Sequence, residues 1–443
     1  MLTRSRWERF LDLFARVRPG EGRAVFHFMG YGFLVMFVLY MLKTLREPLL
    51  LSESTAQTKS YGYAVTALIL LFIVPIYSAL YRKFPTRELS FWLYGILLAG
   101  QLGFFLLSRS PVKIGFAYYV WVGIFGGLIT AQFWAFAANS FNVKAGQRVF
   151  PLIMIGTALG GLLGPALAGQ MLKIMSVQNF MLIVLAVLAL NMFLIRLSPD
   201  VVPEFSRSVE SPPGPRNGPV KGGFAQVFGN RYLLSIASMI VLLNWVNTTG
   251  EYILADLVIG HVEVLLAEDS SLDKSRIIGG IYGNFYTLSN ALSLLLQLFV
   301  VSRVLTWVGV RGALLILPVI VFVGYGLVFF VPIFSVIRLV KIMENSTDYS
   351  MMNTARHSLF LPLSAAEKYQ ARITIDTFFW RFGDLIQGLV VYIGLNFLDF
   401  EVSQFAVMNM FLALVWIALA RKVGRSYMRL ENSATTRTPP LGE

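Results

Sequence analysis

The sequence predicts an all-α membrane protein with twelve transmembrane helices, organised as two six-helix halves that are parallel repeats. Of its 443 residues, 56% are hydrophobic and only 14% are charged, whereas a soluble protein keeps about a quarter of its residues charged. Twelve apolar segments are each long enough to cross a bilayer core of about 30 Å. The basic residues between these segments gather on one side of the membrane.

The twelve segments form two groups of six with a polar stretch between them. The first half, 24–197, contains segments at 24–51, 60–81, 89–108, 112–139, 147–172 and 178–197. The second half, 229–421, contains segments at 230–259, 276–301, 309–331, 333–356, 370–397 and 402–421. Residues 198–228 are rich in proline, glycine, serine and arginine, which predicts a cytoplasmic linker. Residues 422–443 are polar and predict a disordered cytoplasmic tail.

Charges in the short connections predict the orientation of the chain. One side receives the N-terminus, the linker, the C-terminal tail and basic turns such as those with Arg82, Lys83, Arg303 and Arg311. The other side receives few cations, among them Lys59. The positive-inside rule therefore places both termini in the cytoplasm, and the sequence predicts a multi-pass protein of a bacterial inner membrane.

The remaining composition excludes several classes of function. The net charge of +13 is explained by the topology, so no nucleic-acid partner is predicted. The chain has no cysteine, which excludes disulfides and thiolate metal sites. His27, His261 and His357 lack the spacing of metal ligands. We therefore predict no metal, no cofactor and no enzymatic activity, and we expect a monomer whose partners are the lipid bilayer and a small molecule.

The N-terminal arm, 1–23, is basic and aromatic. Apolar residues such as Trp7, Phe10 and Phe14 recur at helical spacing among arginines. This pattern predicts an amphipathic helix on an anionic lipid surface. A disordered positive arm that only sets the orientation is the alternative.

Six spans, a cytoplasmic linker and six more spans are the layout of the major facilitator superfamily. Two pairs of similar segments, one member of each pair in either half, support this assignment. The basic turn 81–87 after the second span matches 302–311 after the eighth, and both resemble a weakened form of that superfamily's loop motif. Residues 138–141, which end the fourth span, similarly match 356–359, which end the tenth.

Polar residues at membrane depth are the candidate substrate contacts, and the first group lies in span one. Lys43, Arg46 and Glu47 follow i, i+3, i+4 spacing and therefore share a helix face with Tyr40 close by. Charges at such depth are costly and usually face a protein interior or a watery cavity. The alternative is a helix end whose charges snorkel to the far interface.

The second group lies in span seven, which is equivalent to span one in the other half. Asn244, Asn247 and Glu251 share one face, and Gly250 makes a local break in the helix plausible. In this architecture spans one and seven both line a central cavity. The alternative is a polar cluster that only packs helices. For Asn139 and Asn353 we favour hydrogen bonds between helices, although Asn139 is kept as a candidate site residue.

The third group lies in span eleven. Arg372 and Asp376 are spaced i, i+4, and Arg381 and Asp384 are spaced i, i+3. Two internal ion pairs that hold the bundle together are the alternative to a substrate site. With span one, these residues contain four cations and three acids, and an excess of arginine and lysine suits an anionic substrate.

Glycines cluster in span five. Gly156 with Gly160, and Gly160 with Gly164, form small-xxx-small pairs. Such pairs allow helix backbones to approach closely. A phosphate-binding loop needs glycine between a strand and a helix, which is not the case here. We therefore predict a packing role for these glycines, and the same for Gly279, Gly280 and Gly283.

Three stretches resemble the nucleotide transporters (ATP/ADP exchangers) of plastids and intracellular bacteria and their free-living bacterial relatives. Residues 42–47 are similar to a basic-xx-basic-acid element of that family. Residues 133–139 and 143–152 resemble its FWGFAN and VDEAKRFYPL motifs. Residues 368–376, with Arg381 to Asp384, resemble KYKGKAAID followed by RxGK.

The resemblance implies a secondary transporter that exchanges ATP and ADP, with Lys43 and, by conservative replacement, Arg372 binding phosphates. The chain departs from the family where Lys144 and Ala145 replace an acidic pair. Gln370 and Asp384 also replace cations. Our leading hypothesis is alternating-access transport of an anionic, nucleotide-like or phosphorylated solute. The alternatives are a proton-coupled carrier of another solute, and a membrane receptor or assembly protein with a transporter fold.

Overall fold

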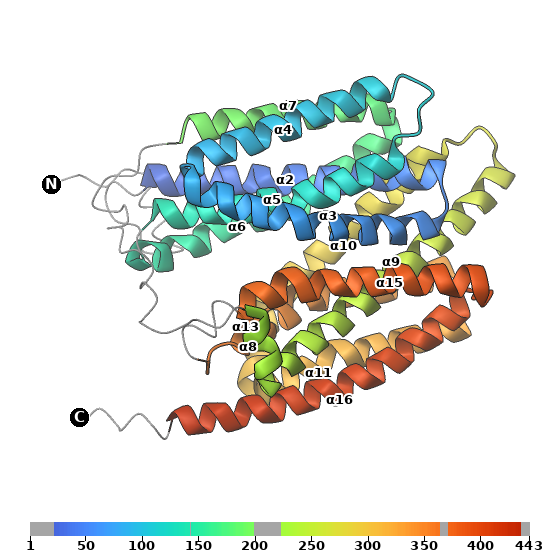
Figure 1. Cartoon of the computed structure of the whole chain (residues 1–443). Helices are drawn as coiled ribbons and strands as arrows, with labels where there is room; N and C mark the ends of the chain where they lie inside the picture. The colour runs from blue at the N-terminus through green and yellow to red at the C-terminus, as the bar shows by residue number, and fades with distance from the viewer. Residues whose placement is uncertain (1–21, 142, 199–222, 364–370, 436–443) are drawn as a thin grey trace. The chain divides into compact units, whose positions relative to one another are not determined.

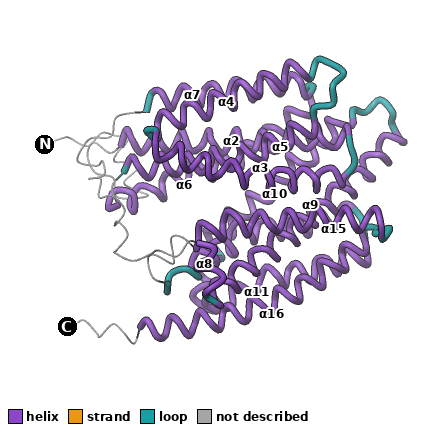
Figure 2. Tube along the Cα trace, viewed as in Figure 1, coloured by secondary structure: helices purple, strands orange, loops and turns teal. Residues whose placement is uncertain are grey.

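The computed structural model describes residues 22–141, 143–198, 223–363 and 371–435. The described chain is almost entirely helical and contains no strand (Figures 1 and 2). Most of the N-terminal arm and most of the linker lie outside the described residues. The same holds for Lys368 and Gln370 of the third family-like motif.

The helices follow the predicted order of segments. The first six are α2 (Gly22–Glu53), α3 (Ala56–Lys83), α4 (Thr86–Leu107), α5 (Gly115–Ser140), α6 (Val143–Ile174) and α7 (Val177–Arg196). Next come α8 (Gly223–Gly229), α9 (Arg231–Glu268), α10 (Lys274–Phe299) and α11 (Val301–Phe330). The last are α12 (Phe334–Thr347), the π-helical turn η1 (Asp348–Met352), α13 (Asn353–Ser358), the π-helical turn η2 (Ile375–Phe379), α15 (Trp380–Phe397) and α16 (Val402–Thr435).

Ten of the described helices are long and apolar enough to cross a membrane. The two other predicted spans are also helical, namely α10 and the succession α12, η1 and α13. Both are more polar than their neighbours, and α12 carries Lys341 and Glu344 in its middle. These two side chains are buried, so other helices cover the part of α12 that lipid could not solvate.

The chain forms two compact units that do not coincide with the two halves of the sequence. The first unit contains residues 1–54, 69–216 and 269–290. The second contains residues 55–68, 217–268 and 291–443. The start of α3 is thus grouped with the second half, and the start of α10 with the first. A single boundary within 198–228 therefore does not separate the two units, because each unit also contains a segment from the other half of the sequence.

In the first unit, α2 packs closely against α6. A Cβ atom added to Gly160 would overlap the carbonyl oxygen of Phe33 on α2, and Gly156 and Gly164 approach the same helix in the same way. The prediction that these glycines serve packing is confirmed. Gly283 of α10 similarly meets the backbone of Gly169 on α6, which joins the exchanged segment of α10 to the first unit.

We expect Gly160→Ala to lower the stability of the first unit. The added methyl group must push α2 away from α6, and overpacking of this kind costs about 1–3 kcal/mol. Gly103→Ala on α4 is the control, because nothing lies within 4 Å of the position of its Cβ atom. Thermal unfolding in detergent, followed by tryptophan fluorescence, should show a lower Tm for Gly160→Ala alone. An equal Tm for both variants would contradict the packing role.

Three connections differ from the predictions. The tail was predicted to be disordered from residue 422, but α16 continues as a helix to Thr435. The end of the predicted linker forms the short helix α8. The basic turn after span eight is helical from Val301, and the change of direction occurs at Gly309, where φ is 66°. Glycine adopts this left-handed conformation without the steric cost that a Cβ atom imposes.

Candidate substrate site

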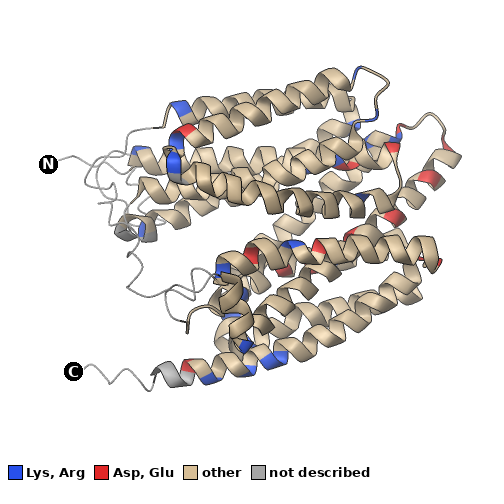
Figure 3. Cartoon of the chain, in the orientation of Figure 1, with Lys and Arg blue, Asp and Glu red and all other residues tan. Residues whose placement is uncertain are grey.

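Charged residues are sparse along most of each long helix and gather near helix ends (Figure 3). The candidate residues inside the helices form three clusters. The α2 cluster contains Tyr40, Lys43, Arg46 and Glu47 with neighbours from α5 and α10. The α9 cluster contains Asn247 and Glu251 with Lys59, Lys341, Glu344 and Asn345. The span-eleven pairs are Arg372 with Asp376 and Arg381 with Asp384.

The α2 cluster is built on a buried part of its helix. Arg46 is 6% exposed and Glu47 is fully buried, and Arg46 Nε lies 3.2 Å from Glu47 Oε1. The Arg46 guanidinium also lies over the ring of Tyr119 on α5, 4.2 Å from its centroid. The alternative of a snorkelling helix end is therefore wrong. The helix runs six residues beyond Glu47 to Glu53, and a buried guanidinium needs the partners that it has here.

Two residues of α10 form hydrogen bonds with the α2 cluster. Tyr286 donates its hydroxyl hydrogen to Glu47 Oε1 at 3.0 Å. Tyr40 donates to Asn290 Oδ1 at 3.1 Å, and Asn290 in turn donates to the carbonyl oxygen of Gly161 at 2.7 Å. Tyr286 and Asn290 are one helical turn apart, so a single face of α10 fixes both an acid and a tyrosine of α2.

Lys43 lies between these fixed positions. Its ammonium nitrogen is 4.9 Å from the centroid of the Tyr40 ring, a distance at which a cation is attracted to the face of an aromatic ring. Lys43 is half-buried, whereas Arg46 and Glu47 are buried. Of the three charges predicted from the sequence, Lys43 is thus the one that retains exposed surface.

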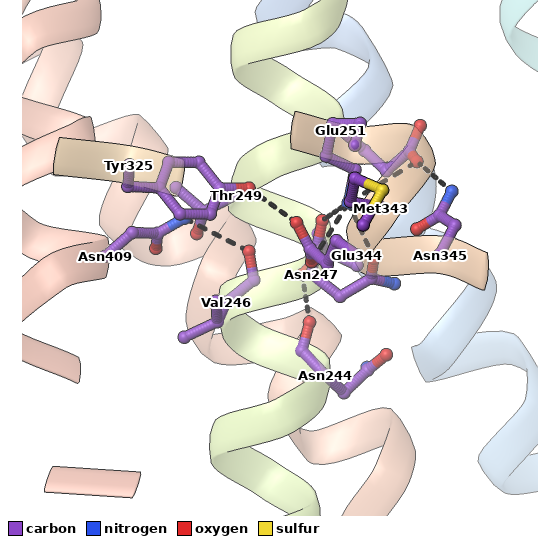
Figure 4. A network of polar contacts seen from close by, with 12 residues as sticks. Asn244, Val246, Asn247, Thr249, Glu251, Tyr325, Met343, Glu344, Asn345 and Asn409 are labelled. Carbon is purple, nitrogen blue, oxygen red and sulfur yellow. Dashed lines mark hydrogen bonds and ion pairs between the residues drawn. The ribbon is translucent and has the colours of Figure 1, made fainter. Parts of the chain in front are cut away.

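The α9 cluster contains four buried charges, namely Lys59, Glu251, Lys341 and Glu344. Figure 4 shows the two acids among their neighbours. Lys59 Nζ lies 3.0 Å from Glu251 Oε2, and Lys341 Nζ lies 3.7 Å from Glu251 Oε1. Lys341 Nζ also lies 3.1 Å from Glu344 Oε1. The two ammonium groups and two carboxylates alternate, so each charge adjoins one of opposite sign. Such pairing is the condition under which charges are tolerated in a protein interior.

Neutral groups complete the hydrogen bonds of the α9 cluster (Figure 4). Lys341 donates to Asn247 Oδ1 at 2.7 Å. Tyr325 of α11 donates to Glu344 Oε2 at 3.0 Å, and Asn345 Nδ2 donates to Glu251 Oε1 at 3.4 Å. The network therefore joins α9, α11 and α12 with the start of α3.

Two predictions about this region are wrong. Lys59 was assigned to a loop outside the membrane, but it is fully buried in the first turns of α3. Gly250 was expected to break span seven, but α9 is a continuous helix from Arg231 to Glu268. The reason for a glycine there is packing, because a Cβ atom would overlap the hydroxyl oxygen of Tyr325.

Both ion pairs predicted from the spacing in span eleven are present. Arg372 Nε lies 3.5 Å from Asp376 Oδ2, and Arg381 Nη1 lies 3.3 Å from Asp384 Oδ2. Asp376 of the first pair lies in the π-helical turn η2, and π turns inside helices occur frequently at functional sites. Arg372 and Asp376 remain partly exposed, whereas Asp384 is buried.

Asn244 of span seven holds Asp384 in place and is not part of the α9 cluster. Asn244 Nδ2 donates to Asp384 Oδ1 at 2.7 Å and to the carbonyl oxygen of Trp380 at 2.7 Å. This matches the packing alternative for Asn244. At the exposed end of span eleven, Arg372 Nη2 lies 2.9 Å from His357 Nδ1.

Asn139 lies apart from the α2 cluster. It is exposed near the end of α5 and donates to Tyr81 Oη at 2.9 Å and to Thr86 Oγ1 at 2.7 Å. Its contacts are the interhelical hydrogen bonds that the sequence favoured. Asn353 instead accepts a hydrogen bond at 3.2 Å from Arg356 Nη2, one turn along the same helix.

Sequence reasoning missed several residues of these clusters. Lys341 and Glu344 are spaced i, i+3, the same signal that singled out spans one and eleven, so they could have been found. Tyr286 and Asn290 carry no comparable signal, because a tyrosine and an asparagine are common where helices pack. Lys59 was hidden by the polar residues around it, 52–60, which are typical of a loop.

Known proteins resemble the chain at low identity over nearly its whole length. It is 22% identical to ADP,ATP carrier protein 1 of Chlamydia pneumoniae over 93% of the chain and 85% of the relative. It is also 22% identical to ADP,ATP carrier protein 1 of Chlamydia trachomatis serovar D, over 81% and 73%. No protein-family model matches the chain.

Solved structures share the fold. A variant of the nucleoside transporter NupG has a TM-score of 0.65 at 13% identity, covering 92% of this chain and 99% of its own. A bacterial homologue of the iron transporter ferroportin has a TM-score of 0.61 at 12% identity, covering 91% and 98%. The predicted major facilitator fold is confirmed, and so is the resemblance to nucleotide transporters. Together the comparisons indicate an integral, multi-pass membrane transporter.

Proposed function

We propose that the chain is a secondary active transporter that moves an anionic, nucleotide-like or phosphorylated solute by alternating access, with exchange of ATP and ADP as the leading case. The observation that carries this proposal is the cationic α2 cluster. Lys43 and Arg46 lie deep in an apolar helix with one acid beside them. This stretch of α2 thus carries two cations and one acid, and ammonium and guanidinium groups are suited to bind phosphate or carboxylate. The named function of the Chlamydia relatives supports a nucleotide.

Lys43 is the proposed phosphate contact of the α2 cluster, because it keeps exposed surface and is held over an aromatic ring. Arg46 and Glu47 act by position. Glu47 accepts the hydrogen bond of Tyr286 on α10, and Arg46 lies over the ring of Tyr119 on α5, so both residues fix α2 against its neighbours. Tyr40 provides an aromatic face on which a nucleobase could stack, since every base has a π surface.

Arg372 and Arg381 are the proposed cations of the second half. Each is partly exposed and paired with an acid on its own helix. Since a phosphate accepts two parallel hydrogen bonds from one guanidinium, a phosphorylated solute could displace the Asp376 carboxylate from the more exposed Arg372. Asn247 and Glu251 are assigned a coupling role, and Asn139 a structural one.

Uptake into proteoliposomes tests the proposal. Vesicles containing the full chain are loaded with ADP and offered labelled ATP, and we expect uptake at least about tenfold above that of vesicles loaded with buffer, because exchange requires a counter-substrate. Adenosine is the matched uncharged solute and should not be taken up, since it offers the cations no phosphate. Inorganic phosphate and a sugar phosphate extend the panel. If no phosphorylated solute is transported or bound, the proposal fails.

A further inference from the structure

We infer that the α9 cluster is a proton-binding site, which takes up one proton whenever α3 moves away from α9 and releases it when α3 returns. The inference uses the alternating-access part of the proposed function. It does not depend on the identity of the substrate. The observation behind it is that Lys59, a buried cation of the cluster, is supplied by a helix divided between the two compact units.

The attachment of Lys59 to the cluster is specific. Besides the ion pair with Glu251, the next residue of α3, Ser60, accepts a hydrogen bond from Gln387 Nε2 of α15 at 2.9 Å. One turn later, a Cβ atom added to Gly388 of α15 would lie only 2.8 Å from the Cβ atom of Ala64. The start of α3 therefore forms a close and polar contact inside the second unit.

The remainder of α3, from Ile69, belongs to the first unit. Transporters of this fold work largely by rocking one half against the other. Lys59 belongs to the first half of the sequence and Glu251 to the second, so rocking of the two halves changes the contacts between the start of α3 and α9. The contact given up on the side of Lys59 is the buried ion pair with Glu251.

Charges around the cluster balance only while Lys59 is present. In the part of the chain that the structure describes, the titratable and charged groups that face it are Lys59 of α3, Glu251 of α9, Tyr325 of α11, Lys341 and Glu344 of α12, and Asp348 of η1 with Arg356 of α13. Asp348 interacts with the charges of Arg356 and Lys341. Three cations therefore face three acids, with Tyr325 neutral. Removing Lys59 leaves one negative charge uncompensated.

An uncompensated carboxylate in the interior is costly, since removing one partner of a buried ion pair leaves a charge that the protein interior solvates poorly. A proton on Glu251 or Glu344 removes that cost by forming one O–H bond. A metal cation is a poorer substitute, because the ammonium group of Lys341 already lies between the two carboxylates, 3.7 Å and 3.1 Å from them. The proton comes from the bulk aqueous solution through water that reaches the opened contact, and it returns to the solution when Lys59 re-forms its ion pair.

The pH dependence follows from linkage. The separated state binds one more proton than the closed state, so acid favours separation. Within the range in which the carboxylate titrates, the ratio of separated to closed molecules should rise about tenfold for each pH unit of acidification.

Spin-label distances test this without any substrate. The chain has no cysteine, so Thr55→Cys and Val264→Cys introduce the only labelling sites, both at exposed positions. Double electron–electron resonance on the full chain in nanodiscs should show a longer-distance population that grows from about pH 8 to about pH 5, where buried carboxylates titrate. Lys59→Arg retains the cation and should retain this dependence.

Lys59→Gln should abolish the pH dependence, because the cluster then carries the extra proton in both states. Glu344→Gln should also abolish the pH dependence. With one acid removed, the cluster is neutral once Lys59 has moved away, so it has no reason to take up a proton. The second variant keeps the test valid if the first does not fold. Distances that are independent of pH in the unsubstituted cluster, or an unchanged pH response in both variants, would overturn the inference. So would a response to Na⁺ in place of protons. The same distance measured at constant pH with and without ATP tests alternating access separately from proton binding.

Discussion

Replacing Lys341 by methionine is expected to destabilise the second unit more than any other single substitution considered for this chain. Lys341 is fully buried and contacts two carboxylates and the side-chain oxygen of Asn247. Without it, Glu251 retains Lys59, but Glu344 loses its nearest cation. Leaving a buried charge without its partner costs about 3–5 kcal/mol. This is a large share of the roughly 5–15 kcal/mol that stabilises a typical folded protein.

The measurement is thermal unfolding in detergent, with the fraction of monodisperse protein after purification as a second readout. Arg276→Met is the matched control. Arg276 forms an ion pair of similar spacing with Asp273, but both side chains are about half exposed, and surface ion pairs contribute only about 0–1 kcal/mol.

A double substitution separates the charge effect from simple loss of packing. Lys341→Met combined with Glu344→Gln removes one cation and one acid, so the cluster stays neutral. We expect the double variant to be more stable than Lys341→Met alone, since contacting residues in one network are not additive. If Lys341→Met is as stable as Arg276→Met, the α9 cluster does not depend on charge balance, and the proton site inferred above loses its basis.

The fold was predictable because lipid imposes a strong constraint on sequence. A helix that crosses the bilayer needs about twenty apolar residues, and each predicted span is helical in the described chain. Even the packing glycines of α6 could be read from their spacing. The grouping of the start of α3 with the second unit, and of the start of α10 with the first, could not be predicted in this way. It depends on contacts between residues that are distant in sequence.

The polar clusters were predictable only in part, for a related reason. Charges within apolar segments are conspicuous, so α2 and span eleven were found. Lys59 pairs with Glu251, which lies 192 residues away, and its own neighbours Ser52 to Ser60 are polar enough to resemble a loop. Tyr286 reaches Glu47 over 239 residues. Burial of such residues follows from tertiary packing, which local hydropathy does not contain.

Replacing Lys43 by glutamine is expected to reduce ATP binding by about tenfold to a hundredfold, which corresponds to about 1.4–2.8 kcal/mol. The substitution keeps a polar side chain of similar length and removes the charge proposed to contact phosphate. Because Lys43 is half-buried, the Tm without nucleotide should change little. The effect should therefore appear in the affinity, measured by the rise in Tm with ATP concentration.

Lys43→Arg is the comparison that isolates the charge. It should retain most of the affinity, and raised salt should weaken ATP binding to both the unsubstituted chain and Lys43→Arg, since exposed charges are screened. Lys274→Gln, in the first turn of α10, is a control for loss of a cation elsewhere. Equal affinity for ATP in Lys43→Gln and Lys274→Gln would exclude Lys43 as the phosphate contact. The anion would then have to be bound by the arginines of span eleven, with Arg372→Gln as the variant that loses it.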